Sequence, residues 1–389
     1  MPKVTQLSVN GRRGKRPLAG TKRLLRWLAS RTYSCTPLAT IGRTVANRYA
    51  WQSPASHAAF PLRRRPLPVC QIFLYHRIND EGDPFLGGLP VKTFAAQMEY
   101  VARNFPLLTL DQVSREEFPG GHSYYIAVTF DDGYRDNFTC ATPILQRFGI
   151  PATVFLATGF IDSGELPWYD QVRLAFKSSS QSYLSLRELG GPEGRLGDLP
   201  SRLWLLERTL TWLRAQPRSE CLQAIDELFR KLGVSSQLQL SNQMLGWHEI
   251  RQMSKSNIVF GAHTVNHPAL SQISDAELMQ ELGGSKRTIE DRLQLPVSHF
   301  AYPFGQSSDF TAKVKKSVPE AGFKTAVTTI RGLNDRSTDR FELRRFTPWE
   351  SDWALFRMQL DWFRFQYQDV TEKERNQSEH SRETSVVES

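Results

Sequence analysis

The sequence predicts a mainly parallel α/β fold, and three observations support this fold class. Short apolar runs recur along the chain with continuous rather than alternating hydrophobicity, which is typical of strands covered on both faces. Helix start and stop signals lie between several of these runs. Polar side chains able to do chemistry directly follow four of the runs, where the carboxyl ends of parallel strands are expected.

The predicted strands are apolar runs at 71–75, 125–130, 153–157, 258–260, 299–302 and 325–328. Helical sequence separates several of them. Ser274 and Glu277 have the spacing of a capping box ahead of an apolar stripe. The segment from Pro143 to Phe148 stops at Gly149, as a helix end would. Strands that alternate with helices in this way indicate a parallel sheet.

The chain divides into three parts by composition. Residues 1–65 are basic and lack sustained periodicity, and residues 366–389 are polar, so both are expected to be disordered. Between them, residues 66–365 are expected to form one domain. Residues 166–245 interrupt the alternation of strands and helices in this domain. They contain a Gly/Pro-rich loop followed by helical sequence at 203–213 and 222–232. We expect a helical insertion there, either as a cap over one end of a barrel or as another packed layer.

The net charge of +9 is concentrated in the leader. Residues 1–79 hold 15 Lys or Arg and no Asp or Glu, so the remaining residues carry a net charge of −6. An acidic body argues against a nucleic-acid enzyme with a basic groove. The basic leader either makes peripheral contact with an anionic membrane surface or has no selected role.

No apolar run approaches the roughly 20 residues needed to span a bilayer. The leader offers no clear signal peptide either, because Arg26 breaks its apolar stretch. We therefore expect a cytoplasmic or membrane-associated protein. Two interpretations of the leader stay open, a short interfacial amphipathic helix or a segment upstream of the true start. The four cysteines, at 35, 70, 140 and 221, are too scattered for a Cys-x2-Cys zinc site.

Two motifs point to chemistry. Asp131 and Asp132 adjoin each other after an apolar run, and such carboxylates repel unless a cation or a proton holds them. Alternatively, they are solvated side chains of a turn. His263 and His267 have a spacing that places both imidazoles on one side of a helical turn, which suits one metal ion. One Asp and two His make a metal site with room for water, and the second Asp can then act as a base.

These motifs resemble the polysaccharide deacetylase family, carbohydrate esterase family 4, over roughly residues 70–350. Thr129 to Gly133 matches its first motif, and His263 to Pro268 matches its second. The third is represented by Ala301-Tyr302-Pro303-Phe304-Gly305. The resemblance implies a distorted or incomplete (β/α) barrel. It also implies a metal-dependent hydrolase that removes N-acetyl groups from a polysaccharide or oligosaccharide of the N-acetylglucosamine type.

The resemblance also implies roles for single residues. Asp132, His263 and His267 would bind a divalent metal, with zinc expected, and Asp131 would be the general base. The backbone N–H of Phe304 would help to hold the oxyanion, since the donor is main-chain. The expected partner is an N-acetylated polysaccharide or oligosaccharide, and a location in the cell envelope or outside the cell is the alternative that the family offers.

The chain departs from the family pattern in three places. The usual late acid His is absent from 341–346, whereas Tyr75-His76 matches an early motif of a subgroup similar to the biofilm poly-N-acetylglucosamine deacetylases. We therefore expect His76 to be the acid, with simple hydrogen bonding in the barrel mouth as the alternative. Ala301 replaces an Arg that orients the base, and Arg345 is expected to supply that charge from the last strand, with Arg344 as the less favoured alternative.

The fourth motif, an Asp/Trp pair, has Trp168 with Asp170, or Trp247, as candidates. For these residues core packing is an equal alternative. Three other functions also stay open. The chain could be another C–N amide hydrolase, such as one acting on cyclic ureides or imides. It could be an O-deacetylase on the same fold, or a carbohydrate-binding relative without catalysis. The identity of the polymer is open too.

Overall fold

The structure is a computed structural model that describes residues 68–235, 243–348 and 352–361. The predicted leader and tail, together with Cys35, lie outside the described residues. The chain divides into two compact units, one of which is Arg63–Ser351 and holds the barrel. The other unit includes a helix at 353–361. Among the described residues, no helix combines the length and apolar composition needed to cross a membrane.

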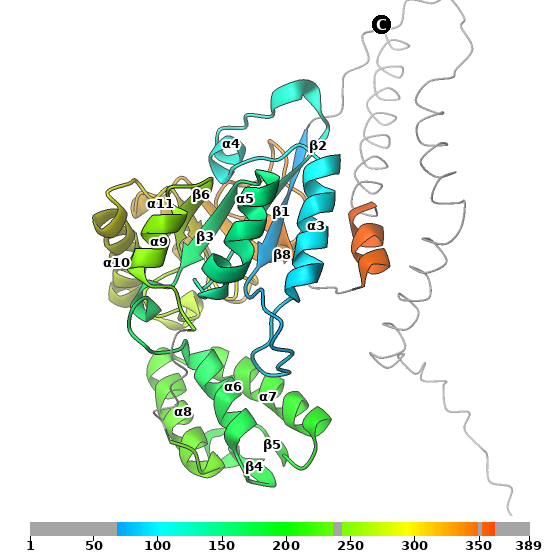
Figure 1. Ribbon diagram of the computed structural model, residues 1–389. Coiled ribbons are helices and arrows are strands. Elements are labelled where there is room, and N and C mark those ends of the chain that lie inside the picture. The colour runs from blue at the N-terminus through cyan, green and yellow to red at the C-terminus, as the bar shows by residue number, and fades with distance from the viewer. Residues whose placement is uncertain (1–67, 236–242, 349–351, 362–389) are drawn as a thin grey trace, which may run out of the picture. The chain divides into compact units, whose positions relative to one another are not determined.

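Seven parallel strands close into a barrel in the order β1-β2-β3-β6-β7-β8-β9, and β9 pairs with β1 (Figure 1). The strands are β1 (Val69–Tyr75), β2 (Tyr124–Phe130), β3 (Ala152–Leu156), β6 (Ile258–Ala262), β7 (His299–Ala301), β8 (Thr325–Arg331) and β9 (Leu343–Phe346). Each of the six predicted runs overlaps one of them. The barrel is distorted, because β6 and β7 share a single register pair and the register between β8 and β9 shifts. The predicted parallel α/β barrel is therefore confirmed.

Helices connect most of the strands and cover the outside of the barrel (Figure 1). Ser274 begins α10 with both hydrogen bonds of the predicted capping box. Gly149 ends α5 in the left-handed conformation, at φ 66°. Apart from the insertion, the helices are α3 (Val91–Asn104), α4 (Leu110–Ser114), α5 (Thr142–Phe148), α9 (Trp247–Met253), α10 (Asp275–Leu293) and α11 (Ala312–Glu320). Short turns complete them: the 3-10 helices η1 (Pro119–Gly121), η3 (Thr158–Phe160) and η5 (Leu270–Gln272), and a π-helix, η2 (Asn137–Ala141).

Between β3 and β6 the chain forms a helical group of its own (Figure 1). It consists of α6 (Trp168–Ser178), β4 (Tyr183–Ser185), η4 (Arg187–Leu189), β5 (Glu193–Arg195), α7 (Leu199–Arg214) and α8 (Arg218–Leu232). The two predicted helical segments lie inside α7 and α8. We call this group the insertion. Leucines and aromatic residues from α6, α7 and α8 are buried against one another in an apolar cluster, which Phe85 and Leu86 from the segment between β1 and α3 join.

A second apolar cluster begins at the amino-terminal end of the barrel and extends through its interior. It is built from the first residues of several strands, including Cys70, Tyr125 and Leu343, and from α4. Ala301 belongs to it as well. The buried carboxylates of Asp131 and Asp132 and the buried guanidinium of Arg345 lie toward the opposite, carboxyl-terminal end.

Candidate metal centre and active site

The residues predicted to do chemistry come from separate strands that end at the same rim of the barrel. His76 follows β1, and Asp131 and Asp132 follow β2. His263 follows β6, and Phe304 lies three residues beyond β7. Parallel strands all end on the same side, so a barrel gathers segments that are far apart in the sequence.

Asp132, His263 and His267 bring three candidate ligand atoms together. The Nε2 atoms of the two imidazoles are 3.1 Å apart. The Asp132 Oδ1 atom lies 3.6 Å from Nε2 of His263 and 3.4 Å from Nε2 of His267. A tetrahedral ion about 2.1 Å from each ligand sets neighbouring ligands about 3.4 Å apart. The three atoms therefore have the spacing that a zinc-sized ion needs.

The chemistry of these donor atoms also fits a cation. Asp132 Oδ1 is buried and accepts no hydrogen bond from any described residue, although it faces two imidazole nitrogens. Burial, together with the carboxylates of Asp131 and Asp170, raises the pKa of Asp132 well above its ordinary value. Burial lowers the pKa of both His263 and His267, which keeps the rings neutral. Neutral imidazoles and an under-satisfied carboxylate are what a bound divalent ion requires.

A backbone carbonyl group orients the imidazole ring of His263. Its Nδ1 lies 2.7 Å from the carbonyl oxygen of Ala301. A carbonyl can only accept a hydrogen bond, so Nδ1 carries the ring proton and Nε2 keeps its lone pair toward the cluster. The backbone of Ala301 thus orients a candidate metal ligand, although its side chain cannot supply the charge of the arginine that it replaces.

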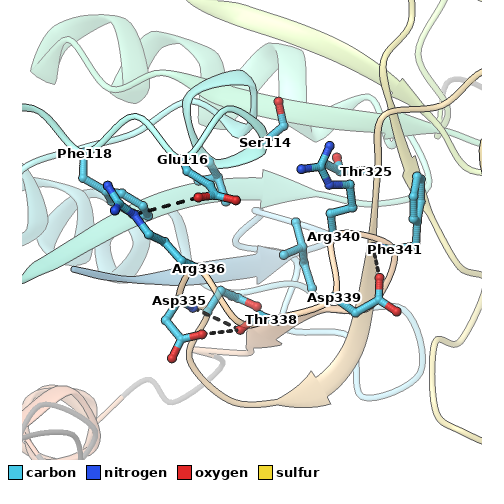
Figure 2. Close-up of a pocket in the computed structure, with 13 residues that line it drawn as sticks. Ser114, Glu116, Phe118, Thr325, Asp335, Arg336, Thr338, Asp339, Arg340 and Phe341 are labelled. Carbon is cyan, nitrogen blue, oxygen red and sulfur yellow. Dashed lines mark hydrogen bonds and ion pairs between the residues drawn. The ribbon is translucent and has the colours of Figure 1, made fainter. Parts of the chain in front are cut away.

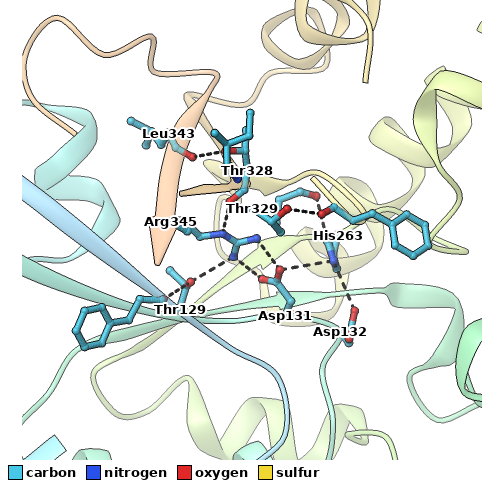
Figure 3. A network of polar contacts seen from close by, with 12 residues as sticks. Thr129, Asp131, Asp132, His263, Thr328, Thr329, Leu343 and Arg345 are labelled. Atoms are coloured by element: carbon cyan, nitrogen blue, oxygen red, sulfur yellow. Dashed lines mark hydrogen bonds and ion pairs between the residues drawn. The ribbon is translucent and has the colours of Figure 1, made fainter. Parts of the chain in front are cut away.

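Asp131 is held by Arg345 rather than by the metal-ligand cluster. Two guanidinium nitrogens of Arg345 each donate to one carboxylate oxygen of Asp131, both at 2.7 Å (Figure 3). Arg345 also donates to the carbonyl of Thr328 at 2.7 Å, and it is 1% exposed. Burial raises the pKa of Asp131, but Arg345, with help from His263, outweighs this and holds the pKa at about 2. Asp131 is therefore ionised, and its Oδ2 lies 3.8 Å from His263 Nε2.

The prediction that His263 and His267 share a helical turn is wrong. Residues 263–268 form an irregular loop after β6, in which Thr264 has φ 67° and His267 has φ 53°. Left-handed residues interrupt a right-handed helix, so helical spacing does not bring the imidazoles together. Instead the chain reverses within the loop, and the Thr264 hydroxyl accepts a hydrogen bond from the N–H of His267 at 3.0 Å.

Two neighbouring segments hold this histidine loop in place. The buried carboxylate of Glu281 on α10 accepts hydrogen bonds from the N–H groups of Val265 and Asn266, at 2.7 and 2.9 Å. On the other side, the N–H of Gly159 donates to the carbonyl of Val265 at 2.8 Å. A Cβ at Gly159 would lie 2.8 Å from that carbonyl oxygen, so the close approach requires glycine.

Sequence reasoning missed Glu281. A signal was present, because Glu281 lies three residues after Leu278 and four before Ser285 on the face of α10 that is buried. A charged residue on a buried face needs partners, and here the partners are the backbone N–H groups of the histidine loop.

Phe304 takes a strained backbone conformation beside the cluster. It has φ 59°, and its ring centroid is 4.8 Å from that of His267. Within the described residues, the N–H of Phe304 donates no hydrogen bond. The rings of Trp168 and Tyr169, from the first turn of α6, lie within 5.9 and 6.1 Å of the Phe304 ring. An aromatic wall therefore borders the cluster on the side of the insertion.

His76 lies at the same rim; the residue as a whole is partly exposed, but the Nδ1 atom of its ring is buried. Burial of its ring lowers the pKa of His76 to about 4, even though the carboxylate of Asp131 acts in the opposite direction. Its backbone carbonyl accepts a hydrogen bond from Asn137 at 2.7 Å, which fixes the chain after β1.

The candidates for the fourth motif lie in different parts of the fold. Trp168 donates from Nε1 to the carbonyl of His267 at 3.2 Å, so it contacts the histidine loop directly. Asp170 is buried and accepts a hydrogen bond from the hydroxyl of Tyr134 at 2.7 Å. Trp247 is buried at the start of α9, where Arg292 packs over its ring. Only the first pair therefore adjoins the site.

A cavity of about 380 Å³ lies at the other end of the barrel (Figure 2). Thr325 and Leu343, which begin β8 and β9, line it together with the loop at 334–341. None of the residues predicted to bind metal or to act in catalysis borders it. The carboxyl-terminal rim is therefore the better candidate for the active site.

Comparisons with known proteins agree with these motifs. The profile of the family described as polysaccharide deacetylase matches residues 120–326. A Bacillus subtilis (strain 168) protein named as a polysaccharide deacetylase, YxkH, is 20% identical over 279 residues, which are 70% of this chain and 69% of that protein.

Solved structures of other proteins also resemble the chain. The Streptococcus pyogenes deacetylase PplD, in complex with acetate, has a TM-score of 0.47 and 19% identity, over 72% of this chain and 92% of that one. IcaB from Ammonifex degensii has a TM-score of 0.47 and 17% identity, over 74% of this chain and 97% of that one. The family profile covers more than half of the 389 residues. The chain therefore belongs to the polysaccharide deacetylase family.

Proposed function

We propose that the protein is a metal-dependent hydrolase that removes N-acetyl groups from a polysaccharide or oligosaccharide of the N-acetylglucosamine type. One observation carries this proposal: an ionised Asp131, held by Arg345, lies beside the cluster of Asp132, His263 and His267. Membership of the polysaccharide deacetylase family supports deacetylation as the reaction. An amide is a poor electrophile with a poor leaving group, so its hydrolysis needs a base, an acid and a site for the oxyanion.

Asp132, His263 and His267 are the residues that would hold the metal. Two imidazole nitrogens and one carboxylate oxygen form a donor set typical of catalytic zinc sites, which supports zinc as the ion. When bound, a divalent ion supplies a Lewis acid that polarises the acetyl carbonyl and lowers the pKa of water.

Asp131 is the proposed general base and takes a proton from the attacking water. Its two hydrogen bonds to Arg345 keep it ionised and fix the direction of its carboxylate. Arg345 therefore acts as the positioning residue for the base, in place of the family arginine that Ala301 replaces.

Phe304 is proposed to hold the negative oxygen that forms when water adds to the acetyl carbonyl. Its N–H has no hydrogen-bond acceptor among the described residues. The Phe304 ring packs against the ring of His267, so this N–H lies close to the candidate metal ligands. Removal of one such donor costs about 3–4 kcal/mol of transition-state stabilisation in well-studied enzymes.

His76 is proposed to give a proton to the departing amine. Burial lowers its pKa to about 4, so the ring is neutral before the reaction begins. The negative charge that develops during the reaction favours uptake of a proton from solvent by the ring, and the protonated ring then donates that proton to the amine nitrogen as the C–N bond breaks.

Acetate release from an N-acetylglucosamine oligomer tests the proposal. Native protein should release acetate, and chelation should abolish the release. Asp132→Asn and His263→Ala should lower the bound metal measured by elemental analysis. A metal-free protein with full activity would overturn the proposal.

A panel of substrates tests the alternatives. We propose residues 66–365 as the catalytic domain, with the insertion at about 166–245, and either the full chain or this segment can be assayed. Faster turnover of an O-acetylated sugar or of a cyclic ureide than of the N-acetylated oligomer would contradict the proposed substrate class. Surface exopolysaccharide and peptidoglycan from the cell envelope belong in the same panel.

A further inference from the structure

The insertion contacts the active-site loop through Arg214, the last residue of α7. The Nε atom of Arg214 lies 3.0 Å from Oδ1 of Asp309. Its guanidinium carbon lies 5.2 Å from the centroid of the Phe304 ring. One side chain of the insertion therefore contacts both ends of the loop at 304–309, which we call the oxyanion loop.

Asp309 closes the oxyanion loop on itself. Its side chain is 3% exposed, and its Oδ2 accepts a hydrogen bond from the N–H of Gln306 at 2.8 Å. The N–H of Asp309 donates back to the carbonyl of Gln306 at 2.8 Å. A buried carboxylate is costly without a cation, and Arg214 is the cation that pairs with it.

Phe304 needs such support because its backbone is strained. A left-handed conformation costs a residue with a side chain about 1–3 kcal/mol and persists only where the surroundings enforce it. From the barrel side, Thr329 donates from its hydroxyl to the carbonyl of Phe304 and from its N–H to the carbonyl of Gly305. From the insertion side, Arg214 covers the ring of Phe304.

We propose that Arg214 is a positioning residue that holds the Phe304 N–H toward the oxyanion. The proposal rests on the function proposed above for Phe304. It gives the insertion a part in the chemical step, since the guanidinium that neutralises Asp309 and covers Phe304 belongs to α7.

Steady-state kinetics of Arg214→Ala test the proposal, with Arg208→Ala as the matched control. Arg208 lies on the same helix, is exposed, and stacks on Trp204 with its guanidinium carbon 4.7 Å from the ring centroid. Loss of an oxyanion donor costs about 10²–10³-fold in kcat, so a displaced donor should cost about 10–100-fold. We expect this loss in kcat for Arg214→Ala, with KM and metal content unchanged, and no loss for Arg208→Ala.

Arg214→Lys provides a conservative variant. Lysine keeps a charge for Asp309 but lacks the planar group that covers the Phe304 ring, so its kcat should lie between those of Arg214→Ala and the native protein. A kcat of Arg214→Ala equal to the native value would overturn the proposal.

Backbone hydrogen exchange gives a readout that does not depend on turnover. Exchange of residues 302–309 should become faster in Arg214→Ala and stay unchanged in Arg208→Ala. Native exchange in that segment, or equally faster exchange throughout the barrel, would overturn the role of Arg214. If the native protein releases no acetate, the proposed function fails, and the exchange result alone decides whether Arg214 holds the loop.

Discussion

The two ends of the barrel use the same seven strands for different purposes. At the amino-terminal end, apolar side chains fill the interior and charged groups pair in solvent, such as Arg336 with Glu116 at 3.8 Å, both about half exposed. At the carboxyl-terminal end, Asp131, Asp132 and Arg345 are buried, each at 3% exposed or less. Burial of charge costs free energy, so the difference fits the proposal that one end contributes stability and the other holds the active site.

The backbone shows the same contrast. Seven described residues other than glycine have a positive φ, and four of them lie at the carboxyl-terminal site: Asp132, Thr264, His267 and Phe304. Strained residues collect at functional sites because the surrounding contacts must hold them there. The site therefore depends on its supporting contacts more than the amino-terminal end does.

The largest expected effect is on turnover. Asp131→Asn should lower kcat by about 10²–10⁴-fold, because an amide cannot take the proton of water. Bound metal should stay at the native level, since Asp131 is not among the proposed ligands. Assays of acetate release and metal content check both points.

Asp111→Asn is the control at the other end of the barrel, where the Asp111 carboxylate lies 3.4 Å from Nε2 of His299. Its kcat should stay within about twofold of native, because a lost hydrogen bond there affects stability alone. Loss of metal from Asp131→Asn would contradict the division of roles between the two aspartates.

The next effect is on stability. Arg345→Met should destabilise the fold by about 3–5 kcal/mol, because it leaves the Asp131 carboxylate buried without its cation. Denaturant unfolding, followed by circular dichroism, measures the free energy of unfolding. Arg345 donates a hydrogen bond to each carboxylate oxygen of Asp131, so the variant removes both of these bonds together with the positive charge.

Arg336→Ala removes the ion pair in solvent at the amino-terminal end for comparison. It should change the free energy of unfolding by less than about 0.5 kcal/mol, since exposed pairs contribute little. If Arg345→Met and Arg336→Ala lowered the free energy of unfolding equally, the result would contradict the proposed difference in stability between the two ends.

The smallest effect expected concerns the support of the histidine loop. Glu281→Ala should weaken metal binding by about 10–100-fold, as loss of an outer partner of a metal site does. Glu281→Gln keeps one acceptor oxygen and should restore part of the affinity. Titration of the metal-free protein with zinc measures the dissociation constant, and native affinity in Glu281→Ala would show that Gly159 and Thr264 hold the loop unaided.

Several features could be predicted from local sequence. Continuous apolar runs marked the strands, because a strand covered on both faces has no polar alternation. The placement of chemical residues after those runs indicated one shared rim, since parallel strands all end on the same side. The capping box at Ser274 and the stop at Gly149 depend on neighbours within a few residues, so they too could be recognised locally.

Other features could not be predicted in this way. The spacing of His263 and His267 favoured a helical turn, yet the loop takes left-handed conformations that contacts with Glu281 and Gly159 enforce. Those partners come from other elements, so no local pattern reveals them. The role of Arg345 beside Asp131 was expected from the family pattern and not from local sequence, because the contact depends on β9 closing against β1.

By itself the sequence determined the class of fold, the strands and the residue types of the site, because these follow from local hydrophobicity and from motifs of adjacent residues. Only the tertiary structure decided that Glu281 meets the histidine loop, that Arg214 meets Phe304, and that Arg345, expected from the family pattern to orient the base, donates two hydrogen bonds to Asp131. Closure of the barrel and packing of the insertion set these distances. Both depend on contacts between residues tens to hundreds of positions apart, which no local pattern encodes.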